Sequence, residues 1–458
     1  MNVVLYVMND LSHDARVRRE AASLVGAGHR VTVIATTAPE QASGTRVAED
    51  GFEVVHIAIP RRYPVWFVWL KHPWRLARRA AVELVAARRQ PRRLALAAAF
   101  AALTVVSIPW IAVRAAWDAI ARVALRRPPG PGVLDYVLRW RAFTLGWARA
   151  AAASAPPADV HHANDMDTLP AALTAARRDG GRVVYDSHEI YLEMGFHARQ
   201  PAWLRWVMRR WERRMVARTV ALITINAVCA AELRRRLRAG RIVVVHNCPP
   251  RWTPPDPPED RIRRAAGIPA DAPVVLCHGG FGAGRGIEET GEAMRRPGLE
   301  LAHLVLLGRM TPIVDAVIGA FPDRNRVHVL PPVPPDQVVA WVAGADVDVM
   351  TLLPVDLNHV VSTPNKLFES IAAGVPVVSS DFPARRAIVA GDPDGPLGEL
   401  CDPADPAAIA AAIRRILDLD PAARLDMRRR ILAAAHDRWN WEAEAAKLVE
   451  LYASLAPA

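Results

Sequence analysis

Closely spaced cysteines are missing from this chain of 458 residues. It has four cysteines, and no two of them form a C-x-x-C pair. This spacing excludes a zinc knuckle and gives no sign of a disulfide framework. A basic stretch ahead of the first apolar segment is also missing, because Met1 leads directly into the strand-like residues 2–8. We therefore expect a reducing compartment and no secretory signal.

The overall composition is that of a folded protein. Apolar residues make up 52% of the chain and charged residues 23%. These proportions exclude a disordered, collagen-like or disulfide-scaffold chain. The length is enough for about three domains of roughly 150 residues each, or for two larger lobes.

The net charge of +11 is unevenly distributed along the chain. Residues 61–141, which we call the basic insert, contain 16 Lys and Arg and three acidic residues, so 16 − 3 = +13. The rest of the chain then carries 11 − 13 = −2, and the positive field is expected to belong to this one segment. Such a distribution argues against a protein that coats nucleic acid. Six of the 14 tryptophans also lie in the basic insert.

An uncharged run of 20 residues, 94–113, lies inside the basic insert. Its length reaches that of a membrane span, although much of it is alanine and Pro109 interrupts it. A span, a segment lying among lipid headgroups, and a helical hairpin packed on the protein's own core are the open interpretations. We favour the headgroup position, because arginine suits anionic lipid and tryptophan suits the interface.

Outside the insert, short apolar runs alternate with helical patterns, which is typical of parallel α/β layers. The predicted fold class is α/β, with two Rossmann-like doubly wound lobes that face a cleft. Strands are expected at 3–8, 30–35, 159–163, 182–186, 221–225, 241–246, 273–280, 301–308, 326–330, 347–353 and 375–380. The predicted divisions are a first lobe at 1–247, a proline-rich linker at 248–260, a second lobe at 261–436, and a C-terminal helix at 437–458 that could cross back to the first lobe.

The string STPNKLFESIAAGVPVVSS at 362–380 is the most informative motif. Ser362 or Thr363 can cap a helix, and Pro364 suits its first turn. The first amides of such a helix are free to bind an anion.

Two charged side chains stand close together on the same predicted helix. Lys366 adds a cation beside the free amide of Asn365, and Glu369 follows on the same helical face. This pattern suits the phosphates and ribose of a nucleotide. An ordinary capped helix with an exposed Lys–Glu pair has the same spacing.

The segment PNKLFESIAAGVPVVSSD resembles the nucleotide-sugar signature of glycosyltransferase family 4 and related GT-B enzymes. Five other strings resemble that family in the right order: DARVRREAASLVGAGHRVTVIA, DVHHANDMDTLPAA, VVYDSHEIYLE, GRGIEE and WNWEAEAAKLVELY. The resemblance covers nearly the whole chain except the basic insert. It implies the GT-B fold and a retaining, hexosyltransferase-type enzyme that uses a nucleoside-diphosphate sugar as donor substrate, with no cofactor and no metal.

The same resemblance implies roles for residues of the second lobe. Glu369 would hold the ribose hydroxyls, Lys366 the diphosphate, and Arg285 would stand where the family usually has a phosphate-binding lysine. The implied donor-binding residues are Gly280, Arg285, Pro364, Asn365, Lys366, Leu367 and Glu369.

Two positions depart from the family pattern. Val361 stands where the family has the first glutamate of a pair, so contacts to the sugar are expected from Asn358 or His359. Gly280 stands in place of a usual arginine, which leaves fewer cations at the leaving diphosphate.

In the first lobe, His188 follows a predicted strand and is expected to point into the cleft. It joins Arg285 and Lys366 as a candidate catalytic residue, although a loop histidine that only satisfies local backbone remains open. The residues expected on the acceptor side are Asn9, Asp10, His162, Asn164, Asp165 and Glu189. Asp165 or Asp167 could instead cap the next helix. No ligand spacing recurs among these residues, so a metal is not expected.

These observations predict transfer of a sugar to a lipid-linked glycan, a glycolipid or a polysaccharide in cell-envelope or exopolysaccharide synthesis. The enzyme is expected in the cytoplasm, peripherally attached to the inner face of the cell membrane. Its expected partners are the nucleotide-sugar donor, the acceptor and an anionic membrane surface, with no nucleic acid. A catalytically weakened membrane scaffold and a sugar-nucleotide epimerase are the alternatives.

Overall fold

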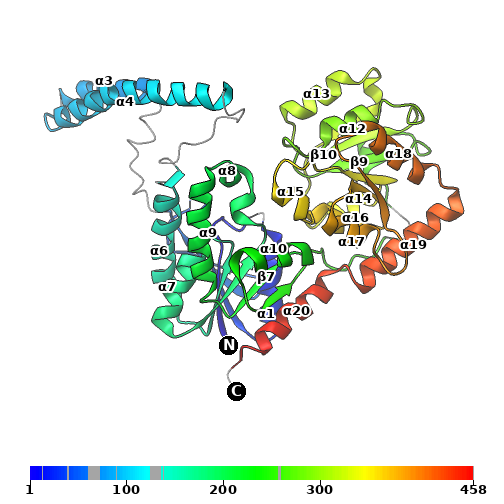
Figure 1. Ribbon diagram of the computed structural model, residues 1–458, viewed down its shortest axis with the longest axis horizontal. Helices are drawn as coiled ribbons and strands as arrows, with labels where there is room; N and C mark the ends of the chain where they lie inside the picture. Colours follow the sequence, from blue (N-terminus) through cyan, green and yellow to red (C-terminus); the bar gives the residue numbers. More distant parts are fainter. Residues whose placement is uncertain are drawn as a thin grey trace.

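Two parallel β-sheets, each covered by helices, divide the chain into two lobes (Figure 1). The computed structural model describes residues 1–12, 14–38, 41–59, 73–88, 90–123, 136–137, 139–255 and 259–456. The predicted fold class, α/β with two Rossmann-like lobes, is confirmed.

The first lobe contains an eight-stranded sheet with the order β3-β4-β2-β1-β5-β6-β7-β8. All its neighbours are parallel except β3 and β4, which form an antiparallel edge. The strands are β1 (Asn2–Tyr6), β2 (Arg30–Thr36), β3 (Thr45–Glu49), β4 (Phe52–Ile57), β5 (Val160–Asn164), β6 (Arg182–Ser187), β7 (Ala221–Thr224) and β8 (Ile242–Val244). The main helices are α1 (Ala15–Gly26), α6 (Gly146–Ser154), α7 (Leu169–Asp179), α8 (Gly195–Ala198), α9 (Ala202–Val216) and α10 (Ala227–Leu237). Strand β5 is buried along its whole length, as expected for a parallel strand with helices on both faces.

The second lobe contains a six-stranded, fully parallel sheet with the order β11-β10-β9-β12-β13-β14. Its strands are β9 (Val274–His278), β10 (His303–Leu307), β11 (Val327–Leu330), β12 (Val347–Met350), β13 (Val377–Ser380) and β14 (Gly398–Cys401). Its helices are α11 (Arg261–Ala266), α12 (Ile287–Ala293), α13 (Pro312–Ala320), α14 (Val338–Val342), α15 (Leu357–Val361), α16 (Asn365–Ala372), α17 (Pro383–Val389), α18 (Pro406–Leu417) and α19 (Pro421–Asp437).

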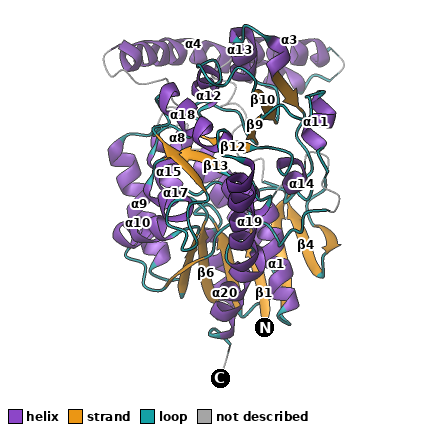
Figure 2. Ribbon diagram, turned by 90° about the vertical axis from the view of Figure 1, so that its right-hand side faces the viewer, coloured by secondary structure: helices purple, strands orange, loops and turns teal. Residues whose placement is uncertain are grey.

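The last helix, α20 (Trp441–Ala453), returns from the second lobe to the first (Figures 1 and 2). Trp441, Leu451 and Tyr452 are buried in a cluster with residues of β1 and β2. Trp441 Nε1 donates to Ser23 Oγ over 2.9 Å. The chain therefore connects the lobes twice, which limits how far they can separate.

The basic insert forms two helices that lie against each other, α3 (Pro73–Ala87) and α4 (Arg93–Val123), and they stand apart from both sheets (Figure 1). Glu83 pairs with Arg79 over 2.8 Å and with Arg93 over 3.3 Å, which ties the two helices together. None of the buried clusters in the described part of the chain contains a residue of α3 or α4.

Large apolar side chains of this hairpin are therefore exposed, including Trp74, Val85, Leu94, Val105 and Ile108. This differs from the open interpretation in which the hairpin packs its apolar side on the protein's own core. Among the described residues, no helix is long and apolar enough to cross a membrane. Trp66 and Trp69 lie outside the described residues.

Candidate functional site

A cavity of about 960 Å³ lies between the two lobes. The residues that line it include His188 directly after β6, Gly279 directly after β9 and Leu352 two positions after β12, so the carboxyl ends of both sheets open into it. Ligands of doubly wound sheets bind at this end of the strands. The cavity is therefore the candidate functional site.

On the second-lobe side, a chain of polar contacts fixes the orientation of Glu369. Its Oε2 lies 3.0 Å from His278 Nε2, and His278 Nδ1 lies 3.2 Å from Asp348 Oδ1. Ser370 Oγ donates to Asp348 Oδ2 over 2.7 Å. Burial opposes the charge of His278, but Asp348 and Glu369 outweigh it and raise its pKa to about 9. A charged His278 therefore holds the Glu369 carboxylate toward the cavity.

Two cations line the same part of the cavity. Lys366, on α16, is only 8% exposed, and burial lowers its pKa. Arg285 lies between β9 and α12, and it forms no ion pair within the described part of the chain. The next residue, Gly286, has φ +73°, and a Cβ there would lie 1.9 Å from Thr351 O. Only glycine permits this close turn, which places Arg285 at the cavity.

The start of α16 differs from the predicted cap. Its N-cap residue is Pro364, which makes no side-chain capping bond. Thr363 Oγ1 instead accepts a hydrogen bond from Asn226 Nδ2 of the first lobe over 3.3 Å. Because Pro364 has no capping oxygen, the first amides of α16 have no side-chain cap beside Lys366.

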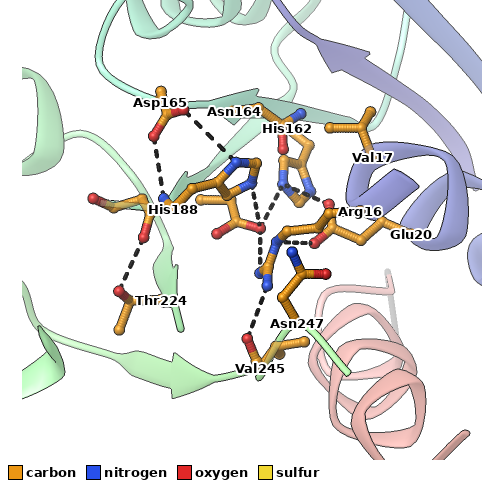
Figure 3. A network of polar contacts seen from close by, with 12 residues as sticks. Arg16, Val17, Glu20, His162, Asn164, Asp165, His188, Thr224, Val245 and Asn247 are labelled. Carbon is orange, nitrogen blue, oxygen red and sulfur yellow. Dashed lines mark hydrogen bonds and ion pairs between the residues drawn. The ribbon is translucent and has the colours of Figure 1, made fainter. Parts of the chain in front are cut away.

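On the first-lobe side, His188 lies between two carboxylates (Figure 3). Its Nδ1 is 3.7 Å from Asp165 Oδ2, and its Nε2 is 3.5 Å from Asp186 Oδ2. Burial opposes the charge, but Asp186 and Asp165 outweigh it and raise the pKa of His188 to about 10. Asp165 holds a left-handed backbone with φ +63°, and its Oδ1 accepts from the His188 amide over 3.1 Å. His188 is therefore a fixed cation at the cavity wall.

Behind His188, Arg16 bridges two buried carboxylates (Figure 3). Its Nη2 lies 2.9 Å from Asp186 Oδ2, its Nε lies 2.9 Å from Glu20 Oε1, and its Nη1 donates to Val245 O over 2.9 Å. Burial opposes ionisation of Asp186, but Arg16 and His188 outweigh it and hold the pKa of Asp186 well below its usual range. Burial and the nearby Asp186 raise the pKa of Glu20.

Glu20, His162 and Asp186 bring three possible metal-ligand atoms within 4.8 Å of one another, and all three residues are buried. The guanidinium of Arg16 already supplies the positive charge that a metal ion would bring to these carboxylates. The arrangement is that of a buried ionic network rather than an open metal site.

Most of the predicted site residues line the cavity. These are Asn9, Asp10, His188, Glu189, Gly280, Arg285, Pro364, Asn365, Lys366 and Glu369. Burial, and then the charge of Asp165, raises the pKa of Glu189 to about 7.

Four predicted residues, Leu367, His162, Asn164 and Asp165, are not among those that line the cavity. Leu367 is buried in the second-lobe core, because it lies on the inward face of α16. His162 is buried and its Nδ1 lies 2.7 Å from the hydroxyl of Tyr452, so it joins α20 to the first lobe. Asn164 Nδ2 donates to Tyr6 O over 3.1 Å inside the sheet. Asp165 acts on the site through its contacts with His188.

Comparison with known proteins shows two matching family models. Residues 95–248 match the description "Glycosyltransferase Family 4", and residues 272–419 match "Glycosyl transferases group 1". The chain is family 4-like in sequence. The resemblance carried by its motifs is thus confirmed.

Curated relatives are named glycosyltransferases as well. D-inositol 3-phosphate glycosyltransferase of Xylanimonas cellulosilytica is 30% identical over 257 residues, which is 53% of this chain and 58% of the relative. The enzyme of the same name from Acidothermus cellulolyticus is 32% identical over 195 residues, 40% of this chain and 41% of the relative. The chain thus spans about half the length of the curated relatives it matches. These names support the predicted hexosyltransferase class.

Solved structures show the GT-B fold over the whole chain. Sucrose-phosphate synthase of Thermosynechococcus elongatus superposes with a TM-score of 0.67, at 17% identity and 99% coverage of both chains. An Anabaena protein in complex with UDP and glucose gives a TM-score of 0.59, at 14% identity, covering 99% of this chain and all of that one. A trehalose-phosphate synthase of Burkholderia xenovorans with glucose-6-phosphate gives 0.61, at 12% identity and the same coverage.

The structure shows what surrounds Val361 and Gly280, the two positions that depart from the family 4 pattern. Val361 is 6% exposed and packs into the core of the first lobe, where a glutamate would bury a charge. Asn358 and His359, which were expected to compensate, both line the cavity. Gly280 lines the cavity, and a further cation, Arg385, is fully buried behind His359, where its Nη2 donates to His359 O over 2.6 Å.

Sequence reasoning missed His278, the residue that orients Glu369 in this family 4-like chain. His278 could have been predicted from its position at the carboxyl end of the strand in PVVLCHGG, because ligands bind at the carboxyl ends of the strands in parallel sheets. Its partner Asp348 lies within a buried strand 70 residues away, and that distance in sequence concealed the pair.

Glu369→Ala is expected to weaken binding of the donor nucleotide by about 1.5–3 kcal/mol, because it removes a charged hydrogen-bond acceptor from the cavity. His278→Gln should cause a smaller loss, since the carboxylate remains but loses its charged partner. Isothermal titration calorimetry measures both affinities. Glu292→Ala removes an exposed carboxylate of the same lobe and serves as the control. Unchanged donor affinity in a folded Glu369→Ala protein would contradict the assignment.

Proposed function

We propose that this chain transfers a sugar from a nucleoside-diphosphate donor to a hydroxyl acceptor, with retention at the anomeric carbon. The observation that carries the proposal is the interlobe cavity, where Lys366, Arg285 and Glu369 of one lobe face His188 of the other. Cations suit the diphosphate and the carboxylate suits ribose hydroxyls. Two family models and the curated relatives support the same class of reaction.

Glycosyl transfer places growing negative charge on the leaving diphosphate, so prearranged cations lower the barrier most. Lys366, Arg285 and the first amides of α16 meet that charge on the second-lobe side. His188 is already protonated at neutral pH, since its pKa lies near 10, and it therefore contributes charge rather than acting as a base. The acceptor proton then passes to the leaving phosphate oxygen on the same face, and no metal is required.

The donor is best identified by a thermal-shift screen of nucleoside-diphosphate sugars, followed by assays of the products. Release of nucleoside diphosphate only in the presence of an acceptor supports the transferase. Interconversion of the sugar supports an epimerase. Binding without turnover supports a scaffold, the function to which Val361 and Gly280 point.

For the acceptor, we propose a lipid-linked glycan or glycolipid at the cytoplasmic leaflet, as in envelope or exopolysaccharide synthesis. The supporting observation is the hairpin α3–α4, which exposes apolar side chains on a segment with a charge of +13. A soluble acceptor requires neither feature. The names of the relatives and of one neighbour favour a second candidate, a soluble sugar or polyol phosphate.

The intact protein is expected to float with anionic vesicles at low salt and less at high salt, because lipid charge attracts the insert. Deletion of residues 65–127 should reduce the bound fraction severalfold. Flotation on neutral and anionic vesicles measures this, and the deletion variant's thermal shift with donor checks its fold. If the intact protein stays soluble on anionic vesicles at low salt, the lipid acceptor is excluded and the soluble phosphate acceptor is favoured.

A further inference from the structure

A second concentration of positive charge lies outside the basic insert. Residues 199–241 contain 12 arginines and two glutamates, so 12 − 2 = +10. The expectation that the positive field belongs to the insert alone is therefore wrong. With +13 in the insert and +10 here, the remaining residues carry 11 − 23 = −12.

The arginines of this segment gather around a cavity on the outer side of α9 and α10. It has a volume of about 450 Å³ and is separate from the interlobe cavity. The basic residues that line it are Arg209, Arg210, Arg213, Arg214, Arg236 and Arg238. We call this surface the α9–α10 face.

Acidic side chains neutralise only part of this charge. Glu193 pairs with Arg236 and lies 3.5 Å from Arg209. Glu212 points inward, where it accepts from the hydroxyl of Tyr185 over 3.0 Å. Within the described ranges, Arg213, Arg214 and Arg238 form no ion pair. The face therefore keeps several uncompensated cations.

Exposed apolar side chains lie on the same face. Trp203 and Trp206 are each 59% exposed. Val207, one helical turn after Trp203, is also exposed. Arg210 stacks over Trp206, with 5.8 Å between Cζ and the ring centroid. Trp203, Trp206, Arg210 and Arg214 are spaced so that they share one side of α9. A helix with tryptophan and arginine on its exposed side is typical of a membrane interface.

The start of α9 lies close to residues that line the interlobe cavity, whereas most arginines of the α9–α10 face lie toward the carboxyl-terminal ends of α9 and α10. Gly195 and Arg199 line that cavity, while Phe196, between them on α8, is exposed. Helix α9 starts three residues after Arg199. In Figures 1 and 2 helices α9 and α10 form one side of the first lobe, and α4 lies above that lobe.

We propose that the α9–α10 face is a second contact surface for an anionic lipid membrane, in addition to the insert. Exposed tryptophans distinguish it from a site for a free phosphate, which needs cations only. The surface would hold the mouth of the interlobe cavity at the headgroups, where a lipid-linked acceptor is presented. This inference rests on the proposed membrane location of the acceptor, but its experiment measures lipid binding apart from transfer.

The test uses the full chain on vesicles of equal parts phosphatidylcholine and phosphatidylglycerol, and on phosphatidylcholine alone. A variant with Arg210, Arg213 and Arg214 changed to Gln should lose at least about tenfold in affinity for the anionic vesicles. Each basic residue near the surface contributes to the attraction between protein and lipid. Trp203→Ala with Trp206→Ala should weaken binding to the same vesicles and leave its salt dependence unchanged. The matched control changes three exposed arginines of the second lobe, Arg264, Arg295 and Arg429, to Gln.

The control should bind as the wild type does, and all variants should keep the donor-induced thermal shift. If the α9 variants bind anionic vesicles as tightly as the wild type while deletion of 65–127 abolishes binding, this inference falls and the proposed function stands. If the wild type does not bind, both membrane proposals fall. Retention on immobilised polyuridine that is lost in the arginine variant, with vesicle binding unchanged, would assign the face to nucleic acid and overturn the lipid proposal.

Discussion

Lys366→Met is expected to lower turnover by about 10²–10³-fold while raising the donor Michaelis constant much less. The charge that Lys366 meets grows as the glycosidic bond breaks, so its removal destabilises the transition state more than the bound donor. Methionine keeps the buried stem of this side chain, which is 8% exposed, and so preserves packing on α16. Steady-state assays of nucleoside-diphosphate release measure both constants.

Arg285→Ala should show the same pattern, and Arg285→Lys should recover much of the loss because lysine keeps the positive charge at that position. Arg264→Ala removes an exposed arginine of the same lobe and provides the control. Full activity of both Lys366→Met and Arg285→Ala would exclude the cationic site. A rise in the Michaelis constant at unchanged turnover would place these cations in ground-state binding only.

Arg16→Met is expected to destabilise the protein by about 3–5 kcal/mol, the usual effect of removing one partner from a buried ion pair. Asp186 and Glu20 would remain buried without the guanidinium that bridges them at 2.9 Å. Urea denaturation of the ligand-free protein, followed by tryptophan fluorescence, measures the change in the free energy of unfolding.

Arg46→Met is the matched control in the same lobe. Arg46 pairs with Glu53 over 2.8 Å, but both side chains are largely exposed, so a loss of about 0–1 kcal/mol is expected. Equal effects of the two substitutions would show that the Arg16 network contributes no more than a surface pair. If Arg16→Met also weakens donor binding in the folded state, the network positions His188 as well as stabilising the lobe.

The strands of both sheets were predictable where apolar runs are long and continuous. The expected strand at 182–186 corresponds to β6, and the expected strand at 273–280 contains β9. Both are buried on two faces, which produces an unbroken apolar pattern. The antiparallel edge β3–β4 and the edge strand β14 were not predicted. Strands β3 (TRVAE) and β14 (GELC) contain few apolar residues, so their pattern is weak, whereas β4 is mostly buried and its apolar run was overlooked.

The candidate site was predictable in its second-lobe part because one continuous motif supplies Lys366 and Glu369 on neighbouring turns of one helix. The first-lobe part was less predictable. His162 and His188 both follow or lie in apolar strands, yet one is buried against Tyr452 and the other lines the cavity. His162 lies in the middle of β5, whereas His188 directly follows the carboxyl end of β6. This difference decides the outcome, and strand boundaries are the least certain part of any prediction from pattern.

The sequence by itself determined the two-lobed α/β architecture, the family 4 resemblance and the helix that carries Lys366 and Glu369, because each depends on local periodicity or a contiguous motif. Only the tertiary structure decided how His278 and Asp348 orient Glu369, how Arg16 holds Asp186 behind His188, and why position 361 is apolar. It also brought the arginines of α9 and α10 onto one surface. These relations join residues far apart in the chain, and their energy comes from burial and charge pairing that exist only after each lobe has folded and, for Val361, after the two lobes have packed together.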